Sequence, residues 1–197
     1  MTIEQTSFPA PTDVVSLTTA KDHLRVDHDL DDTLITAYVG AAYDMVEKYT
    51  GAFLQTTDLE FHFDHIHEFT NIHAGPNAII DRIIDHGTQT KGVSYIDNNG
   101  DRQFLSSDDH QFDGVSYPSR LRVLEIPTDV ADQVNAFRVD VKTGYTNTDR
   151  PDPLVSAMLL IIGHLYENRQ DVGGFRTYET PMSSIFLMNP YRLKSFS

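Results

Sequence analysis

The hydrophobic pattern is densest in residues 152–169, where apolar side chains occupy nearly every side of a predicted helix. An amphipathic surface helix carries a single apolar stripe, so this segment is unusual. Asp152 can cap its N-terminus, Pro153 suits the first helical position, and Arg169 lies near the negative pole of the helix dipole. The apolar run is shorter than the roughly 20 residues that span a membrane. We expect this helix to be covered on most sides, by its own domain, by a neighbouring subunit or by both.

Helical periodicity also marks the N-terminal quarter of the chain. Residues 31–50 place apolar side chains at steps of three and four, and Gly51 follows as a typical residue just beyond a helix C-terminus. Ser16 opens a shorter helix over residues 17–25. Residues 1–15 show no periodicity, which predicts a loose arm. The longer of the two helices is the expected cover for one side of residues 152–169.

Alternating aspartates in residues 27–32 raise the question of a calcium loop. An EF-hand needs glycine at its sixth position and glutamate at its twelfth, and these positions are Asp32 and Tyr38 here. We therefore expect these acidic side chains to cap the helix that follows and to complement its positive end.

Between the two long helices the period changes from helical to two. Leu59, Phe61 and Phe63 alternate with polar residues, and Asn98-Asn99-Gly100 is a typical hairpin turn. Residues 55–145 therefore predict an antiparallel β-rich insertion, with further strands at 69–73, 79–84, 93–97, 102–105, 121–126 and 137–143.

The chain after residue 169 is predicted to end in a short apolar helix at 181–189 and a tail at 190–197. The predicted fold class is α+β: a small helical bundle of two long helices with short N- and C-terminal helices, and an inserted antiparallel β-rich block. Its helical core comprises residues 16–54 and 146–189.

Charge and composition exclude several classes of protein. The net charge is −14, so a basic stripe that would grip nucleic acid is absent. An acidic surface serves solubility, and it also suits a surface that stays near DNA without binding it. The chain has no cysteine, which excludes thiolate metal ligands, and its N-terminus lacks the features of a secretory signal, so a cytoplasmic origin is expected.

The candidate chemistry is limited to a histidine cluster. His65 and His67 form a His-x-His pair, with His62 and His73 nearby, and this spacing occurs in metal sites. A metal-binding protein or enzyme that uses the cluster from His62 to His73 is therefore one alternative. Phosphate-binding loops, nucleophile elbows and zinc-protease motifs are absent from the sequence. The residues themselves give no positive indication of an enzyme.

Five segments, in this order, resemble phage head–tail connector proteins, the adaptors beneath the portal of long-tailed phages and gene transfer agents. They are LTTAKDHLRVD at 17–27 followed by DDTLI at 31–35, VEKYTG at 46–51, HLYENR at 164–169, and PYR at 190–192. The β-rich block between the long helices and the short apolar C-terminal helix also fit this family. The resemblance covers most of the chain, although residues 55–145 match only in character.

The resemblance implies a structural protein of the virion neck, made in the host cytoplasm, with no catalytic residue, metal or cofactor. Such adaptors form a ring, usually of twelve copies, that extends the portal channel and lets DNA pass without sequence-specific binding. Expected partners are further copies of the chain, the portal protein, and a stopper or tail-completion protein, but no membrane. A neighbouring alternative within the virion is that the chain is itself a stopper or tail-completion protein.

The resemblance and the local charge together select candidate contact residues. The tail is basic and aromatic in an otherwise acidic chain, and the family's C-terminal segment often reaches the portal, so the portal-docking candidates are Tyr191, Arg192, Leu193 and Phe196. On the apolar helix, Leu159 and Ile162 are the candidates for packing between subunits. A polar substitution there that keeps the fold but abolishes rings would place that helix face at a subunit interface.

Overall fold

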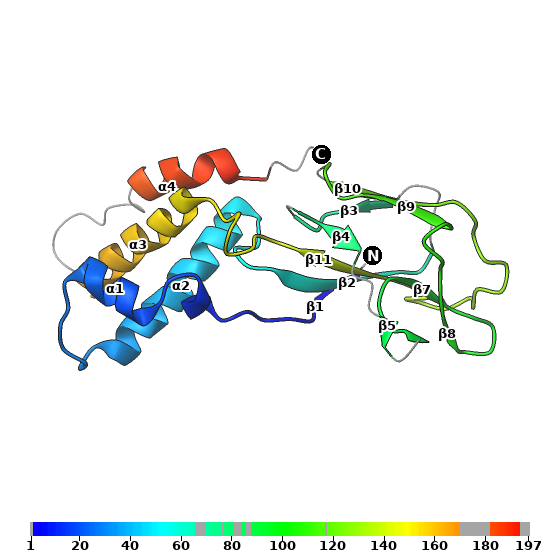
Figure 1. Cartoon of the computed structure of the whole chain (residues 1–197), viewed down its shortest axis with the longest axis horizontal. Coiled ribbons are helices and arrows are strands. Elements are labelled where there is room, and N and C mark those ends of the chain that lie inside the picture. Colours follow the sequence, from blue (N-terminus) through cyan, green and yellow to red (C-terminus); the bar gives the residue numbers. More distant parts are fainter. Residues whose placement is uncertain are drawn as a thin grey trace. The chain divides into compact units, whose positions relative to one another are not determined.

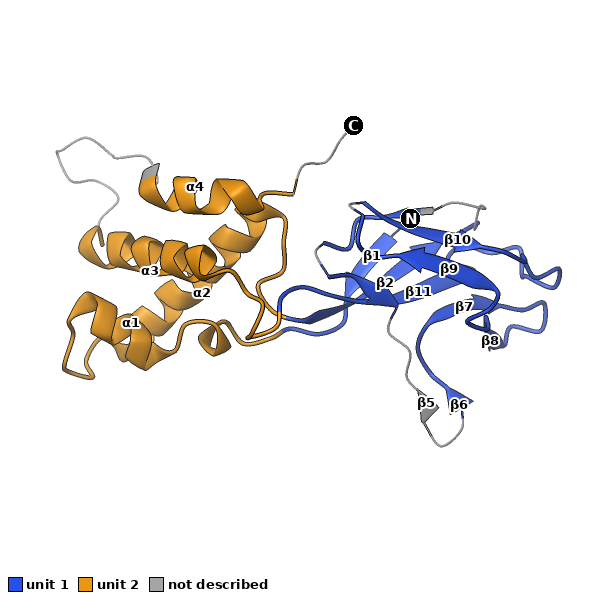
Figure 2. Cartoon of the chain, turned by 45° about the horizontal axis from the view of Figure 1, so that its top comes forward, with its two compact units in different colours: residues 1–8, 56–145, 197 blue, residues 9–55, 146–196 orange. Residues whose placement is uncertain are grey.

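The computed structural model describes residues 2–65, 70–75, 77–80, 84–85, 88–116, 118–169 and 182–193. Within these ranges the chain forms α-helices and antiparallel β-sheets, which confirms the α+β class (Figure 1). The chain divides into two compact units, coloured separately in Figure 2. A β unit comprises residues 1–8 and 56–145, and a helical unit comprises residues 9–55 and 146–196.

The helical unit is organised around the apolar helix that the sequence singles out. It contains α1 (Leu17–Leu24), α2 (Asp32–Thr50), α3 (Asp152–Glu167) and α4 (Met182–Met188), with short 3-10 turns at Pro11–Asp13 and Asn189–Tyr191. Helix α3 packs against each of the other three helices. Its cover is therefore its own unit, with α2 as the expected partner and α4 as a further one.

The core of the helical unit comes mainly from α2 and α3. Both helices bury side chains at helical spacing, and these side chains have at most 2% of their surface exposed. Burying one such aliphatic side chain stabilises the fold by about 1.5–3 kcal/mol. The core residues are Ile35, Val39, Ala42 and Val46 of α2, and Leu154, Ala157, Met158, Ile161 and Ile162 of α3.

Local signals fix the helix ends, with two corrections to the sequence-based expectations. The Ser16 hydroxyl accepts a hydrogen bond from the Thr19 N–H at 3.1 Å, and Gly51 ends α2 in the left-handed region at φ 72°. Asp152 is the first helical residue rather than the cap, because Pro151 occupies the cap position in extended geometry. Asp31 occupies the cap position of α2 without a side-chain cap bond, because its carboxylate is engaged elsewhere.

The described residues of the β unit form antiparallel strands in three sheets, of which the two larger form two layers (Figure 2). The main sheet has the order β1 (Thr2–Gln5), β2 (Thr57–Phe63), β11 (Phe137–Thr143), β7 (Val93–Ile96) and β8 (Arg102–Phe104), and β4 (Ile79–Ile80) also pairs with β11. The second sheet has the order β3 (Thr70–Ile72), β10 (Ser119–Val123) and β9 (His110–Asp113). A third pair is formed by β5 (Ile84–Asp85) and β6 (Thr88–Gln89).

Alternation along β2 and β11 gives the main sheet one apolar and one charged face. Phe61 pairs with Val139 and both side chains are fully buried, whereas the next pair along the register is Glu60 with Asp140. Successive side chains of a strand point to opposite faces, so the charged residues of both strands share one face. This charged face carries the polar cluster described below.

The N-terminal residues form a strand where the sequence predicts a loose arm. Strand β1 pairs antiparallel with β2, placing Glu4 opposite Glu60, and the Thr6 N–H donates to the Asp58 carbonyl at 3.0 Å. A four-residue edge strand has no periodicity that the sequence could reveal. Its stability comes from backbone hydrogen bonds to a partner more than fifty residues away.

Candidate interaction surfaces and a polar cluster

The start of the predicted docking segment is bound to the C-terminal end of α2. Tyr49 donates its hydroxyl to the Asn189 side chain at 2.5 Å, and the Arg192 guanidinium lies over the Tyr49 ring, 5.4 Å from its centroid. The Leu193 N–H donates to the Thr50 carbonyl at 2.7 Å. That carbonyl belongs to the last turn of α2, where acceptors lack helical partners.

The structure describes three of the four portal-docking candidates, and these three differ in burial. Tyr191 and Leu193 are half-buried within the helical unit, whereas Arg192 is exposed. Phe196 lies outside the described residues. Of the described candidates, Arg192 is therefore the most exposed, and the backbone N–H of Leu193 holds the segment against α2.

The two subunit-packing candidates on α3 differ in burial. Ile162 has no exposed surface and is therefore part of the core of its own unit, and its contact with a neighbouring copy stays a prediction. Leu159 is half-buried and stays a candidate for contact with a neighbouring copy. The sequence could not separate them, because both lie on a helix that is apolar nearly all round.

A charged clamp joins the start of α2 to the end of α3. The Asp31 carboxylate accepts hydrogen bonds from the Tyr166 hydroxyl at 2.6 Å and from the Arg169 guanidinium at 2.9 Å. Both hydrogen bonds hold the pKa of Asp31 below its ordinary value, and the one from Tyr166 has the larger effect. Arg169 also stacks over the Tyr166 ring at 4.3 Å. The residues that carry the family resemblance in this region thus act in folding.

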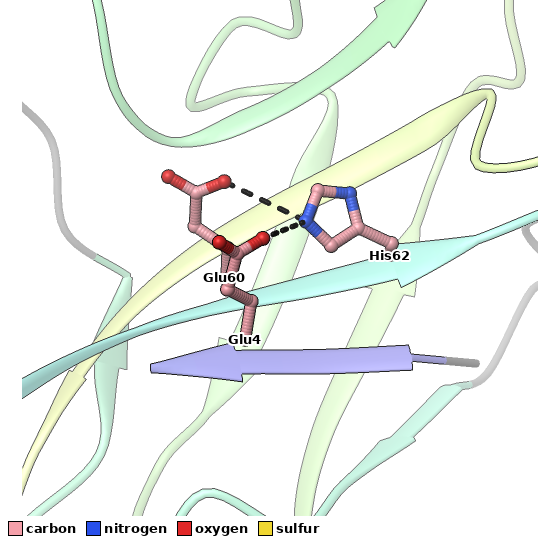
Figure 3. Close-up of side chains that lie close together, drawn as sticks. All are labelled: Glu4, Glu60 and His62. Carbon is pink, nitrogen blue, oxygen red and sulfur yellow. Dashed lines mark ion pairs between the residues drawn. The ribbon is translucent and has the colours of Figure 1, made fainter. Parts of the chain in front are cut away.

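The polar cluster lies on the charged face of the main sheet, at its β1 edge (Figure 3). Glu4 of β1 and Glu60 of β2 both direct their carboxylates at the His62 ring, with oxygen to Nε2 distances of 3.9 and 3.5 Å. Arg138 of β11 lies 3.7 Å from Glu60 and 3.2 Å from Asp140. Burial is the largest influence on Asp140, and it raises the pKa of that carboxyl.

The described histidines of the expected cluster, His62, His65 and His73, do not form a group with metal-ligand spacing. Among the described residues, the one group of three with metal-ligand spacing is Glu4, Glu60 and His62. His65 and His73 are exposed and do not join it, and His67 lies outside the described residues. Sequence reasoning missed Glu4 because its place depends on the pairing of β1 with β2. The alternation of Glu60 and His62 was a visible signal for those two.

The described helices include none that is both long enough and apolar enough to cross a membrane.

Comparisons with known proteins give one family and several similar structures. The family model of the phage gp6-like head–tail connector protein matches residues 14–117. A chain from the neck of an empty gene transfer agent particle, computed with C6 symmetry, is 16% identical with a TM-score of 0.74, covering 100% of this chain and 98% of that one. A chain from the neck of a native particle, computed with C12 symmetry, is 15% identical with a TM-score of 0.69 and the same coverage. No curated protein matches the sequence significantly.

Proposed function

We propose a ring-forming connector function in the virion neck for this chain, because it belongs to the phage gp6-like head–tail connector family. The single observation that carries the proposal is the family match, which spans α1, α2 and the strands from β2 to β9. The full-length similarity in fold to neck chains of gene transfer agent particles supports the same conclusion. Such a protein acts through its shape, its self-association and its docking to partners, so no residue is assigned a catalytic role.

The ring would consist of copies of this chain, with twelve as the proposed number. The similar chains come from necks computed with C6 and C12 symmetry, which supports a cyclic arrangement with heterologous contacts. We assign Leu159 to the contact between neighbours, because it is the half-buried member of the two α3 candidates. A half-buried leucine loses its remaining exposed surface when a neighbour covers it.

The acidic composition suits a ring through which DNA passes. With a net charge of −14, the chain repels phosphate, so DNA would move through the lumen without tight or sequence-specific binding. This part of the proposal needs no nucleic-acid-binding residue.

Docking to the portal is assigned to the C-terminal segment, with Tyr191, Arg192, Leu193 and Phe196 as its contact residues. Hydrogen bonds from Leu193 to α2 and from Tyr49 to Asn189 give this segment a fixed origin. A fixed origin lowers the entropy that a docking segment loses on binding. Arg192 supplies an exposed positive charge, and arginine is favoured at the energetic centres of interfaces.

The test is binding of the purified full chain to its portal protein, compared with a chain that ends at Asn189, and so lacks residues 190–197, and with Arg192→Ala. We expect the truncation to abolish binding and Arg192→Ala to weaken it about tenfold, a change of 1.4 kcal/mol. Lys48→Ala is the matched control, since it removes one positive charge from a lysine that is 80% exposed on α2. Full binding by the truncated chain would contradict the proposed docking residues. Binding to the tail side of the neck alone would favour a stopper or tail-completion protein.

A further inference from the structure

The polar cluster of Glu4, Glu60 and His62 has a geometric feature that its ion pairs leave unexplained. The His62 Nε2 atom is buried and has no hydrogen-bond partner among the described residues. The nearest carboxylate oxygens, at 3.5 and 3.9 Å, lie beyond the usual 2.7–3.2 Å range of an N–H···O hydrogen bond. Leaving a buried ring nitrogen without a partner is unfavourable, so such atoms in proteins normally have one.

The same distances suit ligands around a shared metal ion. Ligand atoms about 2.0–2.1 Å from a tetrahedral zinc ion are roughly 3.3 Å from one another. The separation of 3.5 Å between Glu60 and His62 is close to this value. Glu4 needs only a small movement, and its side chain is 68% exposed on an edge strand, where it is free to adjust. All three ligand atoms lie within 4.8 Å of one another.

The elements position the three ligands by different means. Glu60 and His62 lie two residues apart on β2, so both point to the charged face of the sheet. Glu4 faces Glu60 across the β1–β2 pair. Each ligand is thus placed by regular antiparallel pairing rather than by a loop, which gives the site a rigid frame.

The nearby positive side chains neutralise the two carboxylates of the cluster only in part. Arg138 is the guanidinium nearest to Glu60, but at 3.2 Å it lies closer to Asp140 than to Glu60, from which it is 3.7 Å away. Glu4 has its one ion pair, among the described residues, with His62. Glu60 therefore shares Arg138 with Asp140, and Glu4 has no arginine partner among the described residues. A divalent cation would complete the neutralisation of Glu4 and Glu60.

We propose that Glu4, Glu60 and His62 form a binding site for a divalent transition-metal ion, with zinc as the ion of best fit. One imidazole and two carboxylates are ligands that zinc accepts, and water would occupy the fourth position. The ion links β1 to β2 and so fastens the N-terminal strand to the edge of the main sheet. The role is structural, and the proposal does not depend on the connector function.

The test uses the full chain without an affinity tag, treated with chelator and titrated with zinc chloride by calorimetry. We expect saturable binding of one zinc per chain. His62→Gln should abolish this binding, and Glu4→Gln should weaken it at least tenfold. Because Glu4 is exposed, its variant tests the site without threatening the fold. His65→Ala is the matched control, since this exposed histidine lies three residues away and should leave binding unchanged.

Hydrogen exchange of the β1 amides gives a second measurement. Zinc should slow the exchange of residues 2–5 in the unmodified chain and have no effect in the Glu4→Gln variant. The proposal is overturned by the absence of saturable binding, or by binding that survives His62→Gln unchanged. Binding lost in His65→Ala but kept in His62→Gln would also overturn it and would move the site to the other histidines.

Discussion

Replacing Ile162 by alanine tests whether α3 is the centre of the helical unit. The side chain has no exposed surface, and the substitution removes three carbon groups. At about 0.8 kcal/mol for each buried methylene, the transfer loss alone is about 2.4 kcal/mol. The cavity left behind adds to this, so we expect a loss of about 3–4 kcal/mol in the free energy of unfolding. Leu159→Ala, on the same helix, should cost about 1–2 kcal/mol because Leu159 is only half-buried.

The assay is urea unfolding followed by circular dichroism at 222 nm. This signal reports on the helical unit, because the described α-helices all belong to it. Ring formation is measured in parallel by sedimentation of the folded variants. Ile162→Ala should lower stability far more than it lowers assembly at conditions where the chain stays folded, and Leu159→Ala should do the reverse.

A small stability loss for Ile162→Ala, under about 1 kcal/mol, combined with loss of rings would refute this reasoning. The residue would then face a neighbouring copy, and α3 would not be covered by its own unit.

Four further substitutions test other parts of the structure. Gly114→Ala should lower the free energy of unfolding by about 3 kcal/mol or more, because the new Cβ would overlap a backbone carbonyl oxygen in the β unit. Gly40→Ala on α2 places its Cβ where nothing lies within 4 Å, so it should raise the free energy of unfolding by up to about 1 kcal/mol. Thermal unfolding compares the two variants. Burial raises the pKa of the Glu47 carboxyl, so the folded state binds the carboxyl proton more tightly than the unfolded chain does. Stability should therefore fall as pH rises through the raised pKa, and Glu47→Gln should remove that fall in a pH series of unfolding measurements. Tyr166→Phe should lower the unfolding midpoint at neutral pH by removing a donor to Asp31, and the difference from the unmodified chain should shrink as pH falls below 3.8 and Asp31 is protonated. An unchanged difference at low pH would show that the Asp31 charge is not what the hydroxyl stabilises.

The sequence predicted the helices well because their signals are local. The apolar positions of α2 and α3 recur at helical spacing, and Ser16 and Gly51 act as the caps that their residue types favour. Strands with strict alternation were also readable: residues 137–143 were expected, and β11 spans Phe137–Thr143. Where the pattern is long and regular, local chemistry decides the element.

What the sequence could not give depends on contacts between distant residues. Strand β1 is four residues long and exists through its pairing with β2, so the N-terminus was expected to be a loose arm. Asp31 has the chemistry of a helix cap, but its carboxylate serves Tyr166 and Arg169, more than 130 residues away. The cluster at His62 likewise needs Glu4, which no spacing along the chain connects to it.

The central claim, that this chain is a connector ring of the virion neck, is tested most directly by imaging it with its portal protein. Purified chain and portal are mixed, and the complex is examined by negative-stain electron microscopy with the copy number read from class averages. The account predicts a ring of this chain, with twelve copies, stacked coaxially on the portal around an open channel. Portal particles that stay bare at saturating concentrations of the chain would contradict it.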